Sequence, residues 1–300
     1  MRRYTKYLQY FTIFCSITII SCIILNPKHF KLFEQFESPD VPCLKISHWY
    51  GRMGNNVWQV KNALHVAISY GYNCIIMPEH TMFNTTKIVM NNPISDAHLK
   101  PIETDFFHTD KILPDLDYTI FDKNKQQVKR HLQQAYTVKA DKVFDEDVLV
   151  IHIRSGDIFD PSPHSEYIQP PLVFYRKVID DGNYRKIILV AEDTKNPCVN
   201  KLLELYNGRI TYTPSSLTDD VKTILSAKHL VSSYGTFTSA LITLSDNIKK
   251  VFNPSYNAHN IEKNPELYEI VNIDLEDYKQ KLSPWTNSEE QRNIMLEYTL

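Results

Sequence analysis

Three side chains that could carry chemistry follow a short apolar run in the middle of the chain. His152, Arg154 and Asp157 lie within six residues, directly after the segment 148–151 (Val-Leu-Val-Ile). An apolar, β-branched run too short for a helix predicts a strand buried on both faces of a parallel sheet. Ligands of such sheets bind beyond the carboxyl ends of the strands, and a guanidinium there is suited to hold a diphosphate. The alternative interpretation is a weak strand-end ion pair between Arg154 and Asp157.

Two further stretches place polar groups where they could complete the same site. Glu192 and Asp193 follow a second predicted buried strand, 186–191, and the segment 232–236 (Ser-Ser-Tyr-Gly-Thr) precedes a predicted helix. A strand-end carboxylate can accept hydrogen bonds from a ribose, and a helix N-terminus binds phosphate oxygens. Taken singly, these features are also typical of a solvated turn and an ordinary helix cap. Together with Arg154 they indicate a nucleotide-diphosphate site.

A glycine-containing turn begins the globular part of the chain. The segment 51–56 (Gly-Arg-Met-Gly-Asn-Asn) joins a predicted strand, 44–50, to a predicted helix, 57–70. Gly71 stands where a left-handed helix cap belongs, and 74–77 reads as the next strand. Two glycines that flank an arginine allow the backbone to approach a ligand, although many such turns are only tight connections.

Strands and helices alternate through the second half of the chain. We expect helices at 172–179, 197–205, 218–225 and 237–244, and strands at 209–212, 229–233 and 249–252. Such alternation predicts an α/β fold with a doubly wound parallel sheet. Residues 78–145 show no sustained period, and the tail beyond residue 254 is expected to be irregular with one terminal helix.

Length and composition limit the possibilities further. Three hundred residues with 43% hydrophobic side chains allow one or two domains with a sizeable core. A net charge of −2 gives no basic surface for a polyanion, which disfavours a nucleic-acid partner.

The N-terminus predicts a membrane anchor. Residues 7–25 are almost wholly apolar, long enough to span a thin bilayer, and are preceded by Arg2, Arg3 and Lys6. This predicts a cytoplasmic tail at 1–6, a transmembrane helix at 7–25 and a proline-containing stem at 26–43, with the rest lumenal. A cleaved signal peptide is the alternative, but no small-residue cleavage site closes the run.

Cysteine use and one sequon fit a lumenal chain. Outside the apolar run, Cys43, Cys74 and Cys198 allow one disulfide and one free thiol, in a pairing that spacing does not decide. No Cys/His cluster with zinc-site spacing is present. Asn84 begins the sequon Asn-Thr-Thr and is a candidate glycosylation site on a surface loop.

Asp115 and Asp117 form a DxD pattern, which metal-dependent glycosyltransferases use to chelate a divalent ion. The residues before them do not read as a buried strand, so a turn or solvated loop is the favoured interpretation.

The set of motifs at 51–56, 152–157 (HxRxGD), 190–193 and 230–237 resembles the conserved motifs of the fucosyltransferase superfamily, most closely its α1,2 branch. The chain differs from that branch at Asn56, Ser155 and Ala191. The resemblance implies two Rossmann-like domains, here 44–145 (acceptor side) and 146–300 (nucleotide-sugar side), that face each other across a cleft. It also implies a Golgi membrane protein of type II topology.

The resemblance further implies that GDP-fucose is the donor and that fucose passes to a glycan hydroxyl with inversion and without a metal or other cofactor. The implied donor contacts are Arg52, Asn55, Arg154, Asp193, Ser233, Thr236 and Phe237. Arg154 would stabilise the leaving diphosphate, and Asp157, His152 or Glu166 would serve as base. The alternatives are a metal-dependent glycosyltransferase that uses Asp115 and Asp117, and an inactive membrane-tethered glycan-binding protein.

Overall fold

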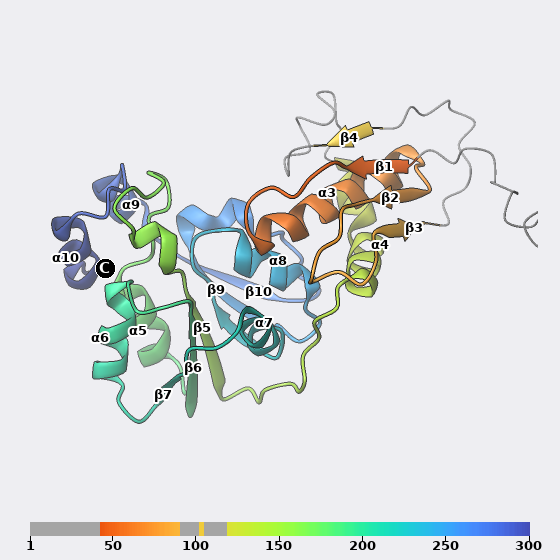
Figure 1. Ribbon diagram of the computed structural model, residues 1–300. Coiled ribbons are helices and arrows are strands. Elements are labelled where there is room, and N and C mark those ends of the chain that lie inside the picture. Colours follow the sequence, from red (N-terminus) through yellow and green to blue (C-terminus); the bar gives the residue numbers. More distant parts are fainter. Residues whose placement is uncertain (1–42, 91–101, 105–118) are drawn as a thin grey trace, which may run out of the picture. The chain divides into compact units, whose positions relative to one another are not determined.

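A computed structural model of the chain describes residues 43–90, 102–104 and 119–300 (Figure 1). The predicted tail, anchor and stem, and the DxD pattern at Asp115 and Asp117, lie outside these residues. Within the described part, no helix combines the length and apolar character needed to cross a bilayer.

A small sheet begins the described part of the chain. Its strands run in the order β3-β2-β1-β4, where β1 (Cys43–Ile46) pairs in parallel with β2 (Cys74–Ile76) and β4 (Ile102–Thr104), and β3 (Lys87–Val89) pairs antiparallel with β2. The connection from β1 to β2 is the long, largely buried helix α3 (Met53–Tyr70). Gly71 ends this helix with φ 78°, so the predicted left-handed cap is confirmed.

A larger, fully parallel sheet follows, in the order β10-β9-β8-β5-β6-β7. All six residues of the central strand β5 are buried, as the apolar run predicts. The α/β class and the parallel sheet are therefore confirmed. The strands are β5 (Val148–Ile153), β6 (Lys186–Ala191), β7 (Ile210–Tyr212), β8 (His229–Val231), β9 (Lys250–Pro254) and β10 (Glu269–Ile273).

Helices cover both faces of this sheet (Figure 1). On one face, α7 (Leu217–Leu225) and α8 (Thr236–Leu244) pack into the same apolar core as α3. On the other face, the core contains α5 (Leu172–Asp181) and α6 (Pro197–Leu205) together with the C-terminal helices α9 (Glu276–Leu282) and α10 (Glu289–Glu297). The helix α3 thus packs on the small sheet and, through α8, on the large one. The predicted domain limits at 44–145 and 146–300 stay predictions.

Several expected elements are wrong in extent. Strand β1 ends at Ile46, and α3 begins at Met53 rather than at residue 57, so the second half of the glycine-containing turn is the first turn of a helix. The polar stretch before residue 145 contains α4 (Thr119–Ala135), which was missed. Its buried stripe is narrow, because Val128, Leu132 and Ala135 supply nearly all of it. The C-terminal tail holds strand β10 and two helices rather than one.

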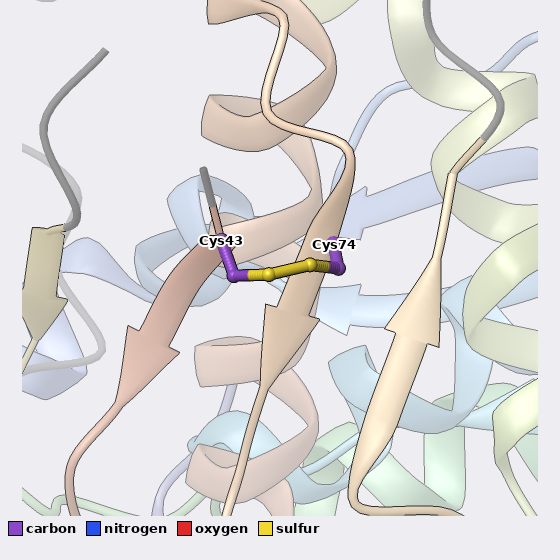
Figure 2. The surroundings of a disulfide bond; sticks show 2 residues. All are labelled: Cys43 and Cys74. Atoms are coloured by element: carbon purple, nitrogen blue, oxygen red, sulfur yellow. A yellow bond between two sulfur atoms is a disulfide. The ribbon is translucent and has the colours of Figure 1, made fainter. Parts of the chain in front are cut away.

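A disulfide joins the first residues of two paired strands (Figure 2). Cys43 in β1 bonds to Cys74 in β2, 31 residues later, while Cys198 is a buried free thiol. The pairing that spacing left open is therefore settled by the register of the sheet, in which Cys43 lies opposite Cys74.

Replacing both Cys43 and Cys74 with serine should lower the free energy of unfolding by about 3–4 kcal/mol, because the crosslink closes a 31-residue loop in the unfolded chain. The measurement is urea unfolding with and without a thiol reductant. The reductant should destabilise the native chain and Cys198→Ala, but leave the double serine variant unchanged. Equal stability of the native chain in both conditions would contradict the prediction.

Candidate functional site: a pocket lined by two arginines

A pocket of about 250 Å³ opens where β5 and β6 end and where α3, α7 and α8 begin. The residues that line it come from five segments far apart in the sequence: Arg52, Met53, Gly54, His152, Ile153, Arg154, Ser155, Glu192, Ser215, Leu217, Asp220, Thr236 and Phe237. This is the position at which open parallel sheets bind ligands, beyond the carboxyl ends of their strands.

The N-termini of α3 and α8 meet in this pocket. A Cβ on Gly54 would lie 2.7 Å from the backbone nitrogen of Phe237 and from the carbonyl carbon of Thr236, so only glycine allows this approach. The Thr236 hydroxyl donates to the Asn55 side-chain oxygen at 2.6 Å. Neither helix has a side chain that caps its N-terminus. Two helix N-termini therefore turn their partial positive charge and backbone N–H groups toward one space, as an anion site requires.

Arg154 adds a full positive charge. Its side chain is only 18% exposed, and its Nη2 donates to Asp157 Oδ1 at 2.7 Å. Its buried Nε has no hydrogen-bond partner among the described residues. A buried donor without a partner is costly, so this guanidinium is suited to a further acceptor.

Arg52 is the second arginine that lines the pocket. Its guanidinium lies 2.9 Å from Glu192 Oε1 and 3.4 Å from Asp157 Oδ1. These ion pairs are about half exposed, and such pairs contribute little net stability. An anionic ligand could therefore replace the carboxylates at small cost. Gly156 permits this arrangement, because it has φ +73° and its Cβ would lie 2.5 Å from the Glu192 carboxylate.

Asp193 organises the loop that carries Arg154. Its carboxylate accepts hydrogen bonds from the Ser155 hydroxyl, from the backbone N–H of Lys195 at 3.0 Å and from that of Gly156 at 3.3 Å. Burial acts to raise the pKa of Asp193, but these hydrogen bonds outweigh it and the pKa is lowered. Asn196 completes the network by donating to the Arg154 carbonyl at 3.0 Å. Asp193 is not among the residues that line the pocket, and its implied contact with the donor stays a prediction.

His152 is buried and paired with Ser233. Its Nδ1 lies 2.7 Å from the Ser233 hydroxyl, and its ring is 4.9 Å from that of Phe237. Burial, assisted by the charge of Arg154, lowers the pKa of His152 to about 3. The imidazole is therefore neutral at pH 7. Ser233 lies behind the pocket, engaged by His152, rather than in its lining.

The structure thus brings most of the sequence-predicted residues together. Arg52, His152, Arg154, Thr236 and Phe237 line the pocket, and Asn55 and Asp157 each contact a lining residue. Glu166 is exposed and is not part of the lining. Asn84 is exposed, with its side-chain nitrogen donating to the Gln134 carbonyl at 3.1 Å, and its glycosylation stays a prediction.

Asp220 is a pocket residue that sequence reasoning missed. It lies on α7, and the lining also includes Ser215 and Leu217 from the start of that helix. Burial raises the pKa of Asp220, with the nearby charges of Asp219 and Glu192 acting in the same direction. In the sequence it reads as an ordinary acidic residue of a first helical turn, so only the packing of α7 beside β6 could reveal it.

No group of three or more His, Cys, Asp or Glu side chains that could hold a metal ion occurs within the ranges that the structure covers. The DxD pattern lies outside them, so its role stays untested.

Comparison with known proteins gives distant structural similarity alone. No protein-family model and no curated protein sequence matches the chain. POFUT1 in complex with GDP-fucose superposes with a TM-score of 0.40 at 10% identity, over 78% of this chain and 98% of POFUT1. The E. coli heptosyltransferase WaaC with ADP gives a TM-score of 0.39 at 11% identity, over 84% of this chain and 98% of WaaC. Similarity at this level decides neither the family nor the function of the chain.

Stability should fall as the pH is lowered from 7 to 5. The pKa of His152 is about 3 and that of His65 about 4, the latter lowered by burial and then by Lys61, against roughly 6.5 for an unfolded histidine. Below pH 6.5 these two histidines bind protons in the unfolded chain but stay neutral in the native chain. Each histidine should therefore lower the free energy of unfolding by about 1.4 kcal/mol for each pH unit below 6.5, down to pH 5.

Urea unfolding at half-unit pH intervals measures this slope. His152→Gln should reduce the slope by about 1.4 kcal/mol per pH unit, while His65 still contributes, as do His80, His131 and His229, whose pKa values burial also lowers. A flat stability between pH 6.5 and pH 5 would show that neither histidine is held neutral.

Proposed function

We propose that this protein is a glycosyltransferase that takes its sugar from a nucleotide diphosphate. The observation that carries the proposal is Arg154, a nearly buried guanidinium with an unpartnered donor, at the place where the N-termini of α3 and α8 converge. Three sources of positive charge around one pocket fit the two phosphates of a sugar nucleotide.

The acidic part of the pocket lining supports a nucleoside. Glu192 and Asp220 are carboxylates, and Ser215 supplies a hydroxyl beside them. Such groups accept hydrogen bonds from ribose hydroxyls or from a base that offers several N–H donors. Guanine offers N1–H and an amino group on one edge, whereas uracil offers a single N–H. This contrast favours GDP over UDP, and the choice of fucose as the sugar rests on the resemblance of the sequence motifs.

In the proposed reaction, an acceptor hydroxyl attacks the anomeric carbon of fucose as the bond to GDP breaks, with inversion. Negative charge develops on the leaving diphosphate, where Arg154 and the two helix N-termini stabilise it without a metal ion. The proton of the acceptor hydroxyl passes to a base. Of the three candidates, His152 is neutral but hydrogen-bonded to Ser233, Asp157 is ion-paired with two arginines, and Glu166 is exposed. An α1,2 linkage on a glycan acceptor is part of the same proposal.

GDP should stabilise the full-length chain in EDTA by about 3 kcal/mol at one hundred times its dissociation constant, and UDP should stabilise it far less. Thermal unfolding in detergent measures both. Stabilisation by UDP with manganese, and none by GDP, would instead support the metal-dependent alternative that uses Asp115 and Asp117. GDP binding without transfer to any acceptor would identify an inactive glycan-binding protein.

Two matched variants test whether Arg154 acts on the donor or only on the fold. Arg154→Lys keeps the charge but loses the planar fork, and it should lower transfer about 10²–10³-fold, or roughly 3–4 kcal/mol of barrier. A mere ion pair with Asp157 would change stability by at most about 1 kcal/mol and leave transfer intact, for this variant and for Asp157→Asn alike. A folded Arg154→Lys variant with near-normal transfer would remove Arg154 from the catalytic role.

We also propose that the chain is a single-pass type II Golgi membrane protein with its catalytic part in the lumen. The disulfide between Cys43 and Cys74 supports an oxidising compartment, and Asn84 is exposed. In intact vesicles, a reporter at the C-terminus should be protected from protease, and Asn84→Gln should remove an enzymatically cleavable glycan. Digestion of the reporter would rule out this topology.

A further inference from the structure

The short segment 285–287 near the C-terminus holds the turn that carries Asp157. The helix α10, which follows this segment, packs beside α5 and α6 (Figure 1). Trp285 is buried, with 1% of its surface exposed, and its indole Nε1–H donates to the carbonyl of Ile158 at 2.9 Å. Its ring packs edge-on against Phe159, with centroids 5.6 Å apart. The contact joins residues 127 positions apart.

A second contact holds the other end of the same turn. Asn287 donates from its side chain to the carbonyl of Asp160 at 3.2 Å and accepts from Arg292 Nε at 2.7 Å. It has φ 58°, a left-handed conformation that residues other than glycine seldom adopt. Such strain persists only where surrounding contacts determine it, and it often accompanies function. The two side chains therefore hold the 3-10 helix Gly156–Phe159 by hydrogen bonds to two carbonyls, one within the helix at Ile158 and one at Asp160, directly after it.

The segment 285–287 is itself held by several hydrogen bonds. Gln291 donates to the carbonyls of Leu282 and Pro284, each at 2.8 Å, and it forms a capping box with Ser288 at the start of α10. The backbone N–H of Trp285 also donates to the Ser165 carbonyl at 2.8 Å. A network with this many satisfied groups fixes the positions of Trp285 and Asn287.

The contacts of Trp285 and Asn287 fix the position of the Asp157 carboxylate. This residue lies in the held turn, and its Oδ1 accepts from Arg154 at 2.7 Å and lies 3.4 Å from Arg52. A displacement of the turn would therefore move the carboxylate against which both guanidinium groups are oriented. Displacements of about 1 Å at supporting residues are enough to impair a site substantially.

We infer that Trp285 and Asn287 are positioning residues for the phosphate-binding arginines, acting through Asp157. The inference takes its ligand, GDP, from the proposed function. That the segment 285–287 holds the turn at residues 156–160 does not depend on that function. It assigns to the C-terminal segment a role in donor binding although none of its residues lines the pocket.

Trp285→Phe tests the inference, because it keeps an aromatic ring but removes the indole N–H. Tyr278→Phe is the matched control, since it also removes one buried bond to a backbone carbonyl, that of Gln169 at 2.9 Å, away from the turn. We expect both variants of the full-length chain to lose thermal stability, and Trp285→Phe to lose more, because it also removes part of a buried ring. Only Trp285→Phe should weaken GDP binding, by about tenfold, and Asn287→Gly should do the same while tolerating the left-handed backbone.

A double-mutant cycle with Asp157→Asn separates positioning from general weakening. If Trp285 acts through Asp157, adding Trp285→Phe to Asp157→Asn should leave GDP affinity unchanged within twofold, while the losses of melting temperature still add. Full additivity in GDP affinity, or equal weakening by Tyr278→Phe, would overturn the inference.

Hydrogen exchange provides a readout that needs no nucleotide. The backbone amides of residues 156–160 should exchange at least tenfold faster in Trp285→Phe than in the native chain or in Tyr278→Phe. Unchanged exchange there would overturn the inference even if GDP binds. Failure of the native chain to bind GDP would remove the proposed function, and the exchange rates would still decide whether the C-terminal segment holds the turn.

Discussion

The site depends on how a guanidinium charge is held at the end of a buried strand. Arg154 emerges from β5, whose six residues are all buried, with one carboxylate partner, Asp157, and an unpartnered donor at Nε. Its neighbours in the pocket include the positive ends of α3 and α8, together with the carboxylates of Glu192 and Asp220. The low-dielectric surroundings of such a cation strengthen its attraction for an anion that enters. The rest of the site can be understood as the means by which this charge is fixed in place.

Three sets of contacts hold the Arg154 guanidinium in place. Asp157 orients the guanidinium directly, Asp193 and Asn196 hold the backbone of the loop after β5, and Trp285 and Asn287 hold the turn that follows. Apart from Asp157, these groups come from distant parts of the chain, yet each bonds to residues 154–160. Preorganisation of this kind removes the reorganisation cost that a flexible arginine would incur on binding a ligand.

The close approach of α3 to α8 joins the small sheet to the large one at the same pocket. Gly54 makes it possible, and the bond between Asn55 and Thr236 fixes its register. Because α3 also packs against the small sheet, the position of Arg52 relative to Arg154 follows from the packing of an entire helix. The Arg52 ion pairs with Glu192 and Asp157 are exposed, so they set the side chain's resting position but contribute little to stability.

From the sequence alone we could predict the α/β class, the buried central strand and five of the residues that line the pocket, because apolar runs, glycines and helix starts are local signals. It placed Arg154, Thr236 and Arg52 at strand ends and helix starts, and these positions meet once a parallel sheet forms. It could not show Asp220 in the pocket, the pairing of Cys43 with Cys74, or the hydrogen bond from Trp285 to the Ile158 carbonyl. Each of these depends on strand register or helix packing between residues far apart in the chain. The polar helix α4 was missed because its buried stripe has few residues, so its place in the fold comes from its contacts with α3 and α8.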